Sequence, residues 1–284
     1  MPQPIIDTHI HIWDLQKAAY PWLEGDGSIL RQNYDLSQLE TERKKTNVTG
    51  GVLVQAAGNK EDTDLMMTAA REHDWIKGVV AWLPLTDPEA VRKWLKEEYL
   101  HNSYFKGVRH QVHDEKNTDW LLQPAVIKSL EILADHDIPY DIVGIHPAHI
   151  ETVLQVTKKV PHLRMVFDHL NQPPIAKQEK FGQWGGLMKE AAQQQNLYTK
   201  ISGLGTTSGK LHQWQADDVT PYIDFVLQEF GADRCFCGGD WPVSLLAGTY
   251  EHAWQVYETV INNLLNKTDS GKVLHDNAVQ FYKL

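Results

Sequence analysis

Short apolar runs recur along the chain, and each is separated from the next by a longer, more polar segment. Apolar runs of this length, bounded by turn residues, are typical of strands that are buried on both faces. They predict strands at residues 5–13, 50–57, 76–83, 105–112, 140–143, 163–169, 197–203 and 234–241. The segments between and after them predict helices at about residues 35–47, 60–73, 124–136, 147–159, 181–195, 220–230, 250–266 and 271–282, and another that begins at Asp87-Pro88.

Strands that alternate with helices indicate a parallel sheet, because parallel neighbours need a long crossover connection. Eight such units within 284 residues fit an α/β fold of the (β/α)8 TIM-barrel type, with one domain over residues 1–284. A dinucleotide-binding fold would carry Gly-x-Gly-x-x-Gly after the first strand, whereas this chain has His9-Ile10-His11 there. The stretch 14–34 has no clear period, and we expect it to cover the site as a loop.

Polar side chains gather where the predicted strands end. His9 and His11 are two residues apart, so a strand would project both toward the same face. Barrel enzymes carry their chemistry at the C-terminal ends of the strands, and burying many ionisable groups is costly unless they pair or bind a ligand. A satisfied polar core group explains any single member well, but it explains the whole set poorly: His9, His11, Gln55, Trp82, Arg109, His110, Asp141, Asp168, His169, Lys200, Ser202, Asp240 and Trp241.

The formal net charge of −10 argues against a nucleic-acid partner, whose phosphates require clustered Lys and Arg, and against an anionic membrane surface. No apolar run approaches the roughly 20 residues that span a bilayer, and no signal-peptide pattern is visible near residue 1. The two cysteines, Cys235 and Cys237, have neither redox nor scaffold spacing and are expected to be buried strand residues. We therefore expect a cytoplasmic metabolic protein.

Five motifs, in order along the chain, carry a family resemblance. They are Asp-Thr-His-Ile-His-Ile-Trp at 7–13, Lys-Gly-Val-Arg-His at 106–110, Phe-Asp-His-Leu at 167–170, Lys-Ile-Ser-Gly-Leu at 200–204 and Gly-Gly-Asp-Trp-Pro-Val at 238–243. The chain resembles the amidohydrolase superfamily, and more narrowly its branch that includes sugar-acid lactonases acting on fuconolactone and rhamnonolactone. The ending at 275–282 also fits this branch.

The resemblance implies that His9, His11, His169 and Asp240 surround the reacting carbonyl and form the candidate metal set. Binuclear members of the superfamily carry a lysine at the end of strand four, whereas this chain has Val108-Arg109-His110-Gln111, so two metals are not expected. One divalent metal, Zn²⁺ first, remains the cofactor hypothesis, with a metal-independent reaction as its alternative. Without a metal, the histidines would hold the carbonyl oxygen through N–H donors.

Asp240 and His169 are the predicted catalytic residues. Asp240 would act as general base, because a partly apolar site raises a carboxyl pKa toward a useful value. The alternatives are a turn or N-cap role for Asp240 and a supporting role beside Asp168 for His169. The predicted substrate-binding residues are Arg109, His110, Lys200, Trp82, Trp241 and Trp13, with rim ion pairs or core packing as the alternatives.

The leading hypothesis is a hydrolase that opens a small sugar lactone, such as fucono- or rhamnonolactone, by attack of water on the lactone carbonyl. A metal-dependent decarboxylase of the same superfamily is the second enzyme hypothesis, and a catalytically silent binding protein is the third. The expected partner is the small-molecule lactone, and a homo-oligomer is left open.

Overall fold

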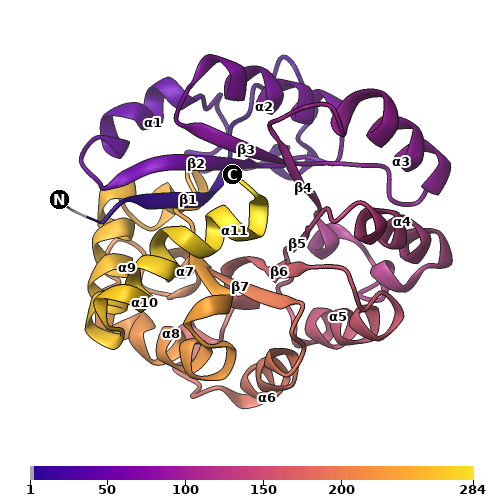
Figure 1. The fold of residues 1–284 in the computed structure, drawn as a ribbon. Helices are drawn as coiled ribbons and strands as arrows, with labels where there is room; N and C mark the ends of the chain where they lie inside the picture. Colours follow the sequence, from indigo (N-terminus) through magenta and orange to yellow (C-terminus); the bar gives the residue numbers. More distant parts are fainter. Residues whose placement is uncertain (1–2) are drawn as a thin grey trace.

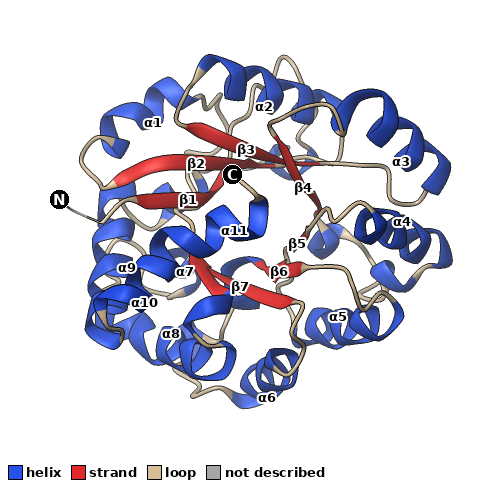
Figure 2. Ribbon diagram, viewed as in Figure 1, coloured by secondary structure: helices blue, strands red, loops and turns tan. Residues whose placement is uncertain are grey.

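The computed structural model describes residues 3–284 and contains one sheet of eight parallel strands in sequential order. The strands are β1 (Ile5–Ile10), β2 (Val48–Val54), β3 (Ile76–Ala81), β4 (Phe105–His110), β5 (Tyr140–Ile142), β6 (Met165–Phe167), β7 (Leu197–Ile201) and β8 (Cys235–Cys237). A parallel bridge between Ile10 and Trp241 links the chain after β8 to β1, so the sheet comes round to a nearly closed barrel (Figure 2). The predicted single-domain (β/α)8 barrel is confirmed.

Helices surround the ring of strands (Figure 1). They are α1 (Leu36–Arg43), α2 (Lys60–Glu72), α3 (Pro88–Trp94), α4 (Pro124–Asp135), α5 (Pro147–Lys159), α6 (Gly182–Ala192), α7 (Leu204–Thr207), α8 (Ala216–Phe230), α9 (Tyr250–Leu264), α10 (Lys267–Gly271) and α11 (Asn277–Tyr282). Short 3-10 or π turns lie at 21–23, 95–99, 112–114, 120–122, 168–171, 175–177, 232–234, 243–246 and 272–276. Asp35, Asn59 and Asp87 cap α1, α2 and α3 through their side chains, which satisfies the free N–H groups of each first turn.

Two boundary predictions differ from the structure in an informative way. The predicted strand at 163–169 is only β6, because residues 169–172 leave the sheet with positive φ angles of 49° to 55°. The predicted helix at 271–282 is interrupted by a π turn at 272–276 before α11.

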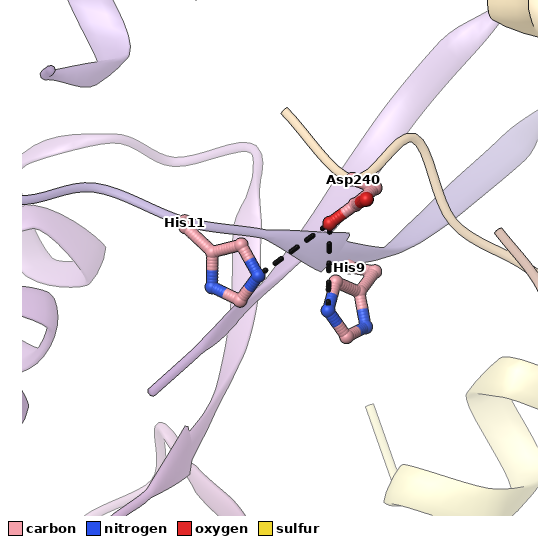
Figure 3. Close-up of side chains that lie close together, drawn as sticks. All are labelled: His9, His11 and Asp240. Atoms are coloured by element: carbon pink, nitrogen blue, oxygen red, sulfur yellow. Dashed lines mark ion pairs between the residues drawn. The ribbon is translucent and has the colours of Figure 1, made fainter. Parts of the chain in front are cut away.

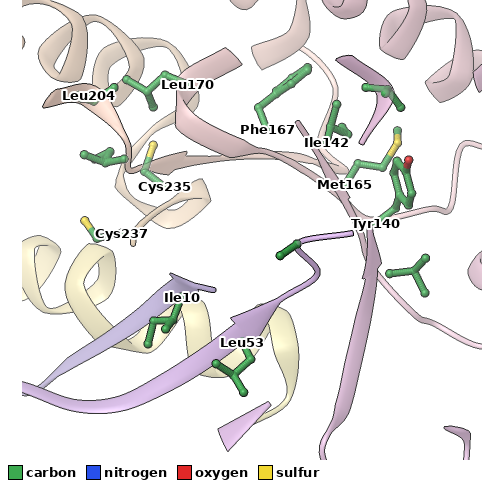
Figure 4. Packing of buried hydrophobic residues seen from close by; sticks show 14 of the residues in the cluster. Ile10, Leu53, Tyr140, Ile142, Met165, Phe167, Leu170, Leu204, Cys235 and Cys237 are labelled. Atoms are coloured by element: carbon green, nitrogen blue, oxygen red, sulfur yellow. The ribbon is translucent and has the colours of Figure 1, made fainter. Parts of the chain in front are cut away.

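The interior of the barrel is closed at the N-terminal end of the strands by α11. Phe281 and Tyr282 from this helix are buried in one cluster with Ile6, Val52 and Phe236, and Figure 1 shows α11 lying across the ring of strands. The larger apolar cluster packs the strands against the outer helices, and it includes Cys235 and Cys237, which are buried free thiols (Figure 4). The opposite end of the barrel is therefore the one open to a ligand. In the described residues, no helix is long and apolar enough to cross a membrane.

Candidate active site

His9, His11 and Asp240 meet at the C-terminal end of the barrel, where β1 adjoins the loop after β8 (Figure 3). The Nε2 atoms of His9 and His11 lie 3.8 and 3.6 Å from Asp240 Oδ1. His169 follows β6, and its Nε2 lies 4.0 Å from the same oxygen. Three residues of the candidate metal set, His9, His11 and Asp240, thus have ligand atoms within reach of one another, and His169 lies beside them.

Asp7 holds β1 and the loop after β8 in register, and the sequence analysis missed this role. Its Oδ1 accepts hydrogen bonds from the backbone N–H groups of His9 (2.9 Å) and Gly239 (2.8 Å), and its Oδ2 accepts one from the Tyr250 hydroxyl (2.7 Å). A Cβ at Gly239 would lie 2.6 Å from Asp7 Oδ2, so glycine permits this close approach. An aspartate within the apolar run 5–10 was the available signal.

A buried network of charges lies beneath the histidines. Lys200 Nζ lies 2.6 Å from Asp141 Oδ2 and 2.9 Å from Asp168 Oδ1, and all three side chains are fully buried. Asp168 Oδ2 also accepts a hydrogen bond of 3.0 Å from Arg109. Burial opposes ionisation of Asp168, but Lys200, His9 and Arg109 together hold its pKa well below the usual range. Two cations are therefore matched by two carboxylates in this layer.

Arg109 uses most of its donors inside the protein. Its Nε donates to Gln55 Oε1 (3.0 Å), one Nη donates to the Gln55 carbonyl, and the other Nη donates to Asp168 and faces His9 Nε2 at 3.2 Å. A guanidinium has five N–H groups, so these contacts with described residues leave one for a ligand. Arg109 borders the cavity, so it can donate one hydrogen bond to a ligand bound there.

The three histidines are neutral at neutral pH. Burial lowers the pKa of His11 to about 3, that of His9 well below its usual value, and that of His169 below its usual value. His11 Nδ1 lies 2.7 Å from the Val54 carbonyl, so it carries the proton and Nε2 presents a lone pair toward Asp240. His169 Nδ1 lies 2.9 Å from Ser202 Oγ.

Acceptor atoms therefore converge at Asp240 Oδ1, and such a group requires a positive or proton-donating partner. One ligand atom each from His9, His11 and Asp240 can be chosen so that all lie within 4.8 Å of one another, and all three residues are buried. Imidazole nitrogen and carboxylate oxygen are ordinary ligands of Zn²⁺. The donor set fits a single divalent cation. Arg109 already places one positive charge beside His9.

A cavity of about 220 Å³ opens above these residues. Its charged lining residues are Arg109 and Asp240, and the rest of its wall is uncharged or carries histidine. The stretch 14–34 was expected to cover the site. Trp22, which belongs to it, borders the cavity. The sequence analysis did not single out several lining residues, because no motif marks them: Trp22, Gln111, His113, Gln172 and Thr206.

The three tryptophans predicted to bind substrate do not border this cavity. Trp13 and Trp241 are buried, and the ring of each is nearly perpendicular to that of Tyr34 at a distance of 5.2 and 5.3 Å. Trp82 lies against Trp94 of α3. β1 ends at Ile10 and β3 at Ala81, so strand alternation does not extend to Trp13 or Trp82.

His110 and Lys200 also lie away from the cavity. His110 points out of the barrel, stacks on Trp120 at a ring distance of 4.0 Å and contacts Glu115 at 2.7 Å. Its neighbour Arg109 points inward, as alternation along β4 requires. Lys200 is held in the charge network below the cavity floor, where Asp141 and Asp168 pair with it.

An eight-stranded barrel with two histidines at the end of its first strand and an aspartate after its eighth has its polar residues where barrel enzymes carry their active sites. The sequence model of the Amidohydrolase family matches residues 6–284, and the chain belongs to that family.

Relatives and solved structures cover nearly the whole chain. The L-fucono-1,5-lactonase of Burkholderia ambifaria is 29% identical over 98% of this chain and 95% of its own length. The L-rhamnono-gamma-lactonase of Scheffersomyces stipitis is 26% identical over 99% and 98%. An amidohydrolase from Burkholderia multivorans, crystallised with bound Zn, has a TM-score of 0.90 at 24% identity over 99% of both chains. A 2,6-dihydroxybenzoate decarboxylase from Rhizobium is more distant, with a TM-score of 0.66 at 14% identity over 99% of both chains.

Proposed function

We propose that this protein hydrolyses a small, uncharged sugar lactone to the open-chain sugar acid. The observation that carries the proposal is one buried carboxylate, Asp240, set among neutral histidines at the floor of a cavity with little other charge. The names of the curated relatives, fucono- and rhamnonolactonases, support the same substrate class.

Asp240 is the proposed general base. Burial raises the pKa of its carboxyl to about 6, while His169 and Arg109 oppose that rise. At neutral pH it is ionised yet basic enough to take a proton from water. The water oxygen then bonds to the lactone carbonyl carbon, and the carbonyl oxygen becomes an oxyanion.

His169 and Arg109 are the proposed donors to that oxyanion. If the Ser202 hydroxyl donates to His169 Nδ1, Nε2 carries the proton and can donate toward the cavity. The remaining N–H of Arg109 adds a charged donor. When the ring C–O bond breaks, Asp240 returns its proton to the leaving ring oxygen, which becomes the hydroxyl of the product. The new carboxyl group then ionises in water.

A divalent cation, held by His9, His11 and Asp240 with His169 beside them, would polarise the carbonyl and acidify water. We propose that hydrolysis does not depend on it, because the Arg109 guanidinium lies 3.2 Å from His9 Nε2 and already supplies positive charge there. That charge also opposes a cation at the same nitrogen.

Treatment with a chelator is therefore expected to lower kcat by less than about tenfold, a change of roughly 1.4 kcal/mol in the barrier. The measurement is lactone hydrolysis before and after chelation, with metal content determined by elemental analysis on both samples. A loss of a hundredfold or more that added Zn²⁺ restores would show that the metal is required.

A lactone panel tests the function itself. Acid release followed with a pH indicator should reveal rapid hydrolysis of one or a few aldonolactones, with L-fucono-1,5-lactone as the first member. The decarboxylase alternative needs a place for a substrate carboxylate, and Arg109 has one N–H left for it. The control reaction is release of CO₂ from 2,6-dihydroxybenzoate with Zn²⁺ or Mn²⁺ added. Activity there and background rates across the lactone panel would reject the lactonase proposal.

Gly203, after β7, supplies a further test of the site. Its φ is +61°, and an added Cβ would lie 2.6 Å from His169 Nδ1 and 2.9 Å from Asp240 Oδ2. Gly203→Ala is therefore expected to displace both catalytic groups and lower kcat/KM more than about tenfold, since small misplacements of reacting groups are costly.

The matched control is Gly186→Ala in α6, where an added Cβ meets nothing within 4 Å. That substitution should leave hydrolysis unchanged and stabilise the helix by about 0.5–1 kcal/mol. Thermal unfolding and lactone hydrolysis are measured on both variants. Equal activity of the two alanine variants would contradict the close packing of Gly203 against the catalytic groups.

A further inference from the structure

The chain after β6 makes a left-handed turn of four successive residues that are not glycine. His169, Leu170, Asn171 and Gln172 have φ angles of 55°, 53°, 51° and 49°. Left-handed conformation costs an ordinary L-residue roughly 1–2 kcal/mol. A run of four is therefore expensive, and such strain persists where the surrounding structure enforces it, frequently at functional sites.

Neighbouring elements hold this turn on three sides. Trp184 of α6 donates a hydrogen bond of 2.8 Å from Nε1 to the Leu170 carbonyl. Asn171 Nδ2 donates to the His146 carbonyl at 3.3 Å, and Ser202 Oγ accepts from the His169 backbone N–H at 3.3 Å. A Cβ at position 144 would lie 2.1 Å from Asn171 Oδ1, so Gly144 gives the turn its space.

The turn places two side chains at one cavity. Residues 169 and 172 both border it, whereas Leu170 and Asn171 are buried behind it. His169 is one of the proposed catalytic groups. The turn therefore places Gln172 on the same wall of the cavity as His169, within the region where the reacting carbonyl would bind.

Gln172 is a costly choice for its backbone conformation. Its φ of 49° and ψ of 77° would suit glycine or asparagine better, and Pro173 restricts it further. Among the described residues, its side-chain amide makes no hydrogen bond, and Gln172 is half-buried and borders a cavity of largely uncharged character. The backbone conformation does not favour glutamine at position 172, so we look to its side chain for the reason.

We propose that Gln172 is a specificity-determining residue whose amide binds a ring hydroxyl of the lactone. An amide offers both a donor and an acceptor, and a hydroxyl offers the same pair in return. The left-handed turn serves to hold this amide and His169 on one wall of the cavity. This inference rests on the proposed lactone hydrolysis. It adds the residue that distinguishes lactones with ring hydroxyl groups from lactones without them.

The test compares two substrates in Gln172→Asn and Gln172→Gly variants. One is the aldonolactone that the wild-type protein hydrolyses fastest, and the other is δ-valerolactone, which has no ring hydroxyl. We expect kcat/KM for the aldonolactone to fall at least about tenfold further than that for δ-valerolactone, mainly through KM, because a site built to bind a hydroxyl discriminates strongly. Both variants should melt at or above the wild-type temperature, since they relieve backbone strain.

Gln178→Gly is the matched control. Gln178 also has a left-handed φ, 52°, but is exposed and does not border the cavity. It should gain stability in the same way and leave the hydrolysis of both lactones unchanged.

Three outcomes would overturn the inference, and each has its own signature. Equal losses on both lactones would mean that the turn only positions His169. Unchanged kinetics in active Gln172 variants would remove any role for the amide. A wild-type protein inactive on every lactone would reject the proposed function, and this inference with it.

Discussion

Asp240→Asn is expected to lower kcat/KM for the lactone by about 10³-fold, because general-base catalysis by a positioned carboxylate contributes roughly 10²–10⁴-fold. The amide cannot take the proton of the attacking water, and it cannot return one to the leaving ring oxygen. Asn has nearly the volume of Asp, so the packing of this buried position should persist.

The pH profile makes this prediction specific to the proton-transfer role. Burial raises the pKa of Asp240 to about 6, and only the ionised carboxylate acts as base. The wild-type kcat/KM should therefore fall as the pH is lowered through about 6, and the variant should lack this acid limb. The measurement is pH-stat titration of lactone hydrolysis, with near-UV circular dichroism to verify folding.

Asp135→Asn, at an exposed position at the end of α4, is the matched control and should retain wild-type rates and pH dependence. If Asp240→Asn kept its rate within tenfold, Asp240 would not be the base. If, in addition, the wild-type protein bound lactones without turnover, the silent binding protein would become the better reading.

The barrel was predictable because parallel strands in a barrel are buried on both faces, and that burial leaves apolar runs in the sequence. The positions of His9, His11 and Asp240 were predictable for a related reason. They are polar residues at the ends of such runs, and the ends of parallel strands meet at one rim. The strand pattern alone gave a larger set of polar residues, and the family resemblance selected these three and His169 from it. The structure brings the three side chains together.

The depth and direction of long side chains were not predictable from strand ends. Lys200 is on the expected strand, but it points into the charge layer below the cavity, where Asp141 and Asp168 pair with it. Alternation along a strand fixes the face of a residue, not the level that its terminal group reaches. Trp13 illustrates the other limit. It continues the spacing of His9 and His11, but it is buried against Tyr34 and does not border the cavity.

The left-handed turn at 169–172 left no sequence signal. Glycine and asparagine are the residues that commonly adopt positive φ. In this turn only Asn171 belongs to that group, and the other three residues rarely adopt positive φ. The contacts that enforce the turn come from Trp184, Ser202 and the Gly144 region. These contacts are distant in sequence, and only the folded chain assembles them.

Lys200→Met is expected to lower the free energy of unfolding by about 3–5 kcal/mol, the usual effect of removing one partner from a buried ion pair. The Lys200 side chain is 0% exposed and pairs with Asp141 and Asp168. Without it, Arg109 would still pair with Asp168, but Asp141 would have no counter-ion and the two carboxylates would repel each other. Asp141 also accepts a hydrogen bond of 2.7 Å from Tyr282, so the loss should reach α11 at the base of the barrel. Urea denaturation at neutral pH measures the change.

Lys210→Met is the matched control, because Lys210 lies at the same 2.6 Å from its partner Asp218 but its side chain is 49% exposed. An exposed pair is worth about 0–1 kcal/mol, so this variant should be nearly as stable as the wild-type protein. Lowering the pH should reduce the loss in Lys200→Met, since protonation of one carboxylate removes the repulsion, and Lys200→Met/Asp141→Asn should recover part of it at neutral pH. Equal stability of the two lysine variants would mean that burial does not set the strength of this network, and the buried charge layer would not be a main contributor to the stability of the barrel.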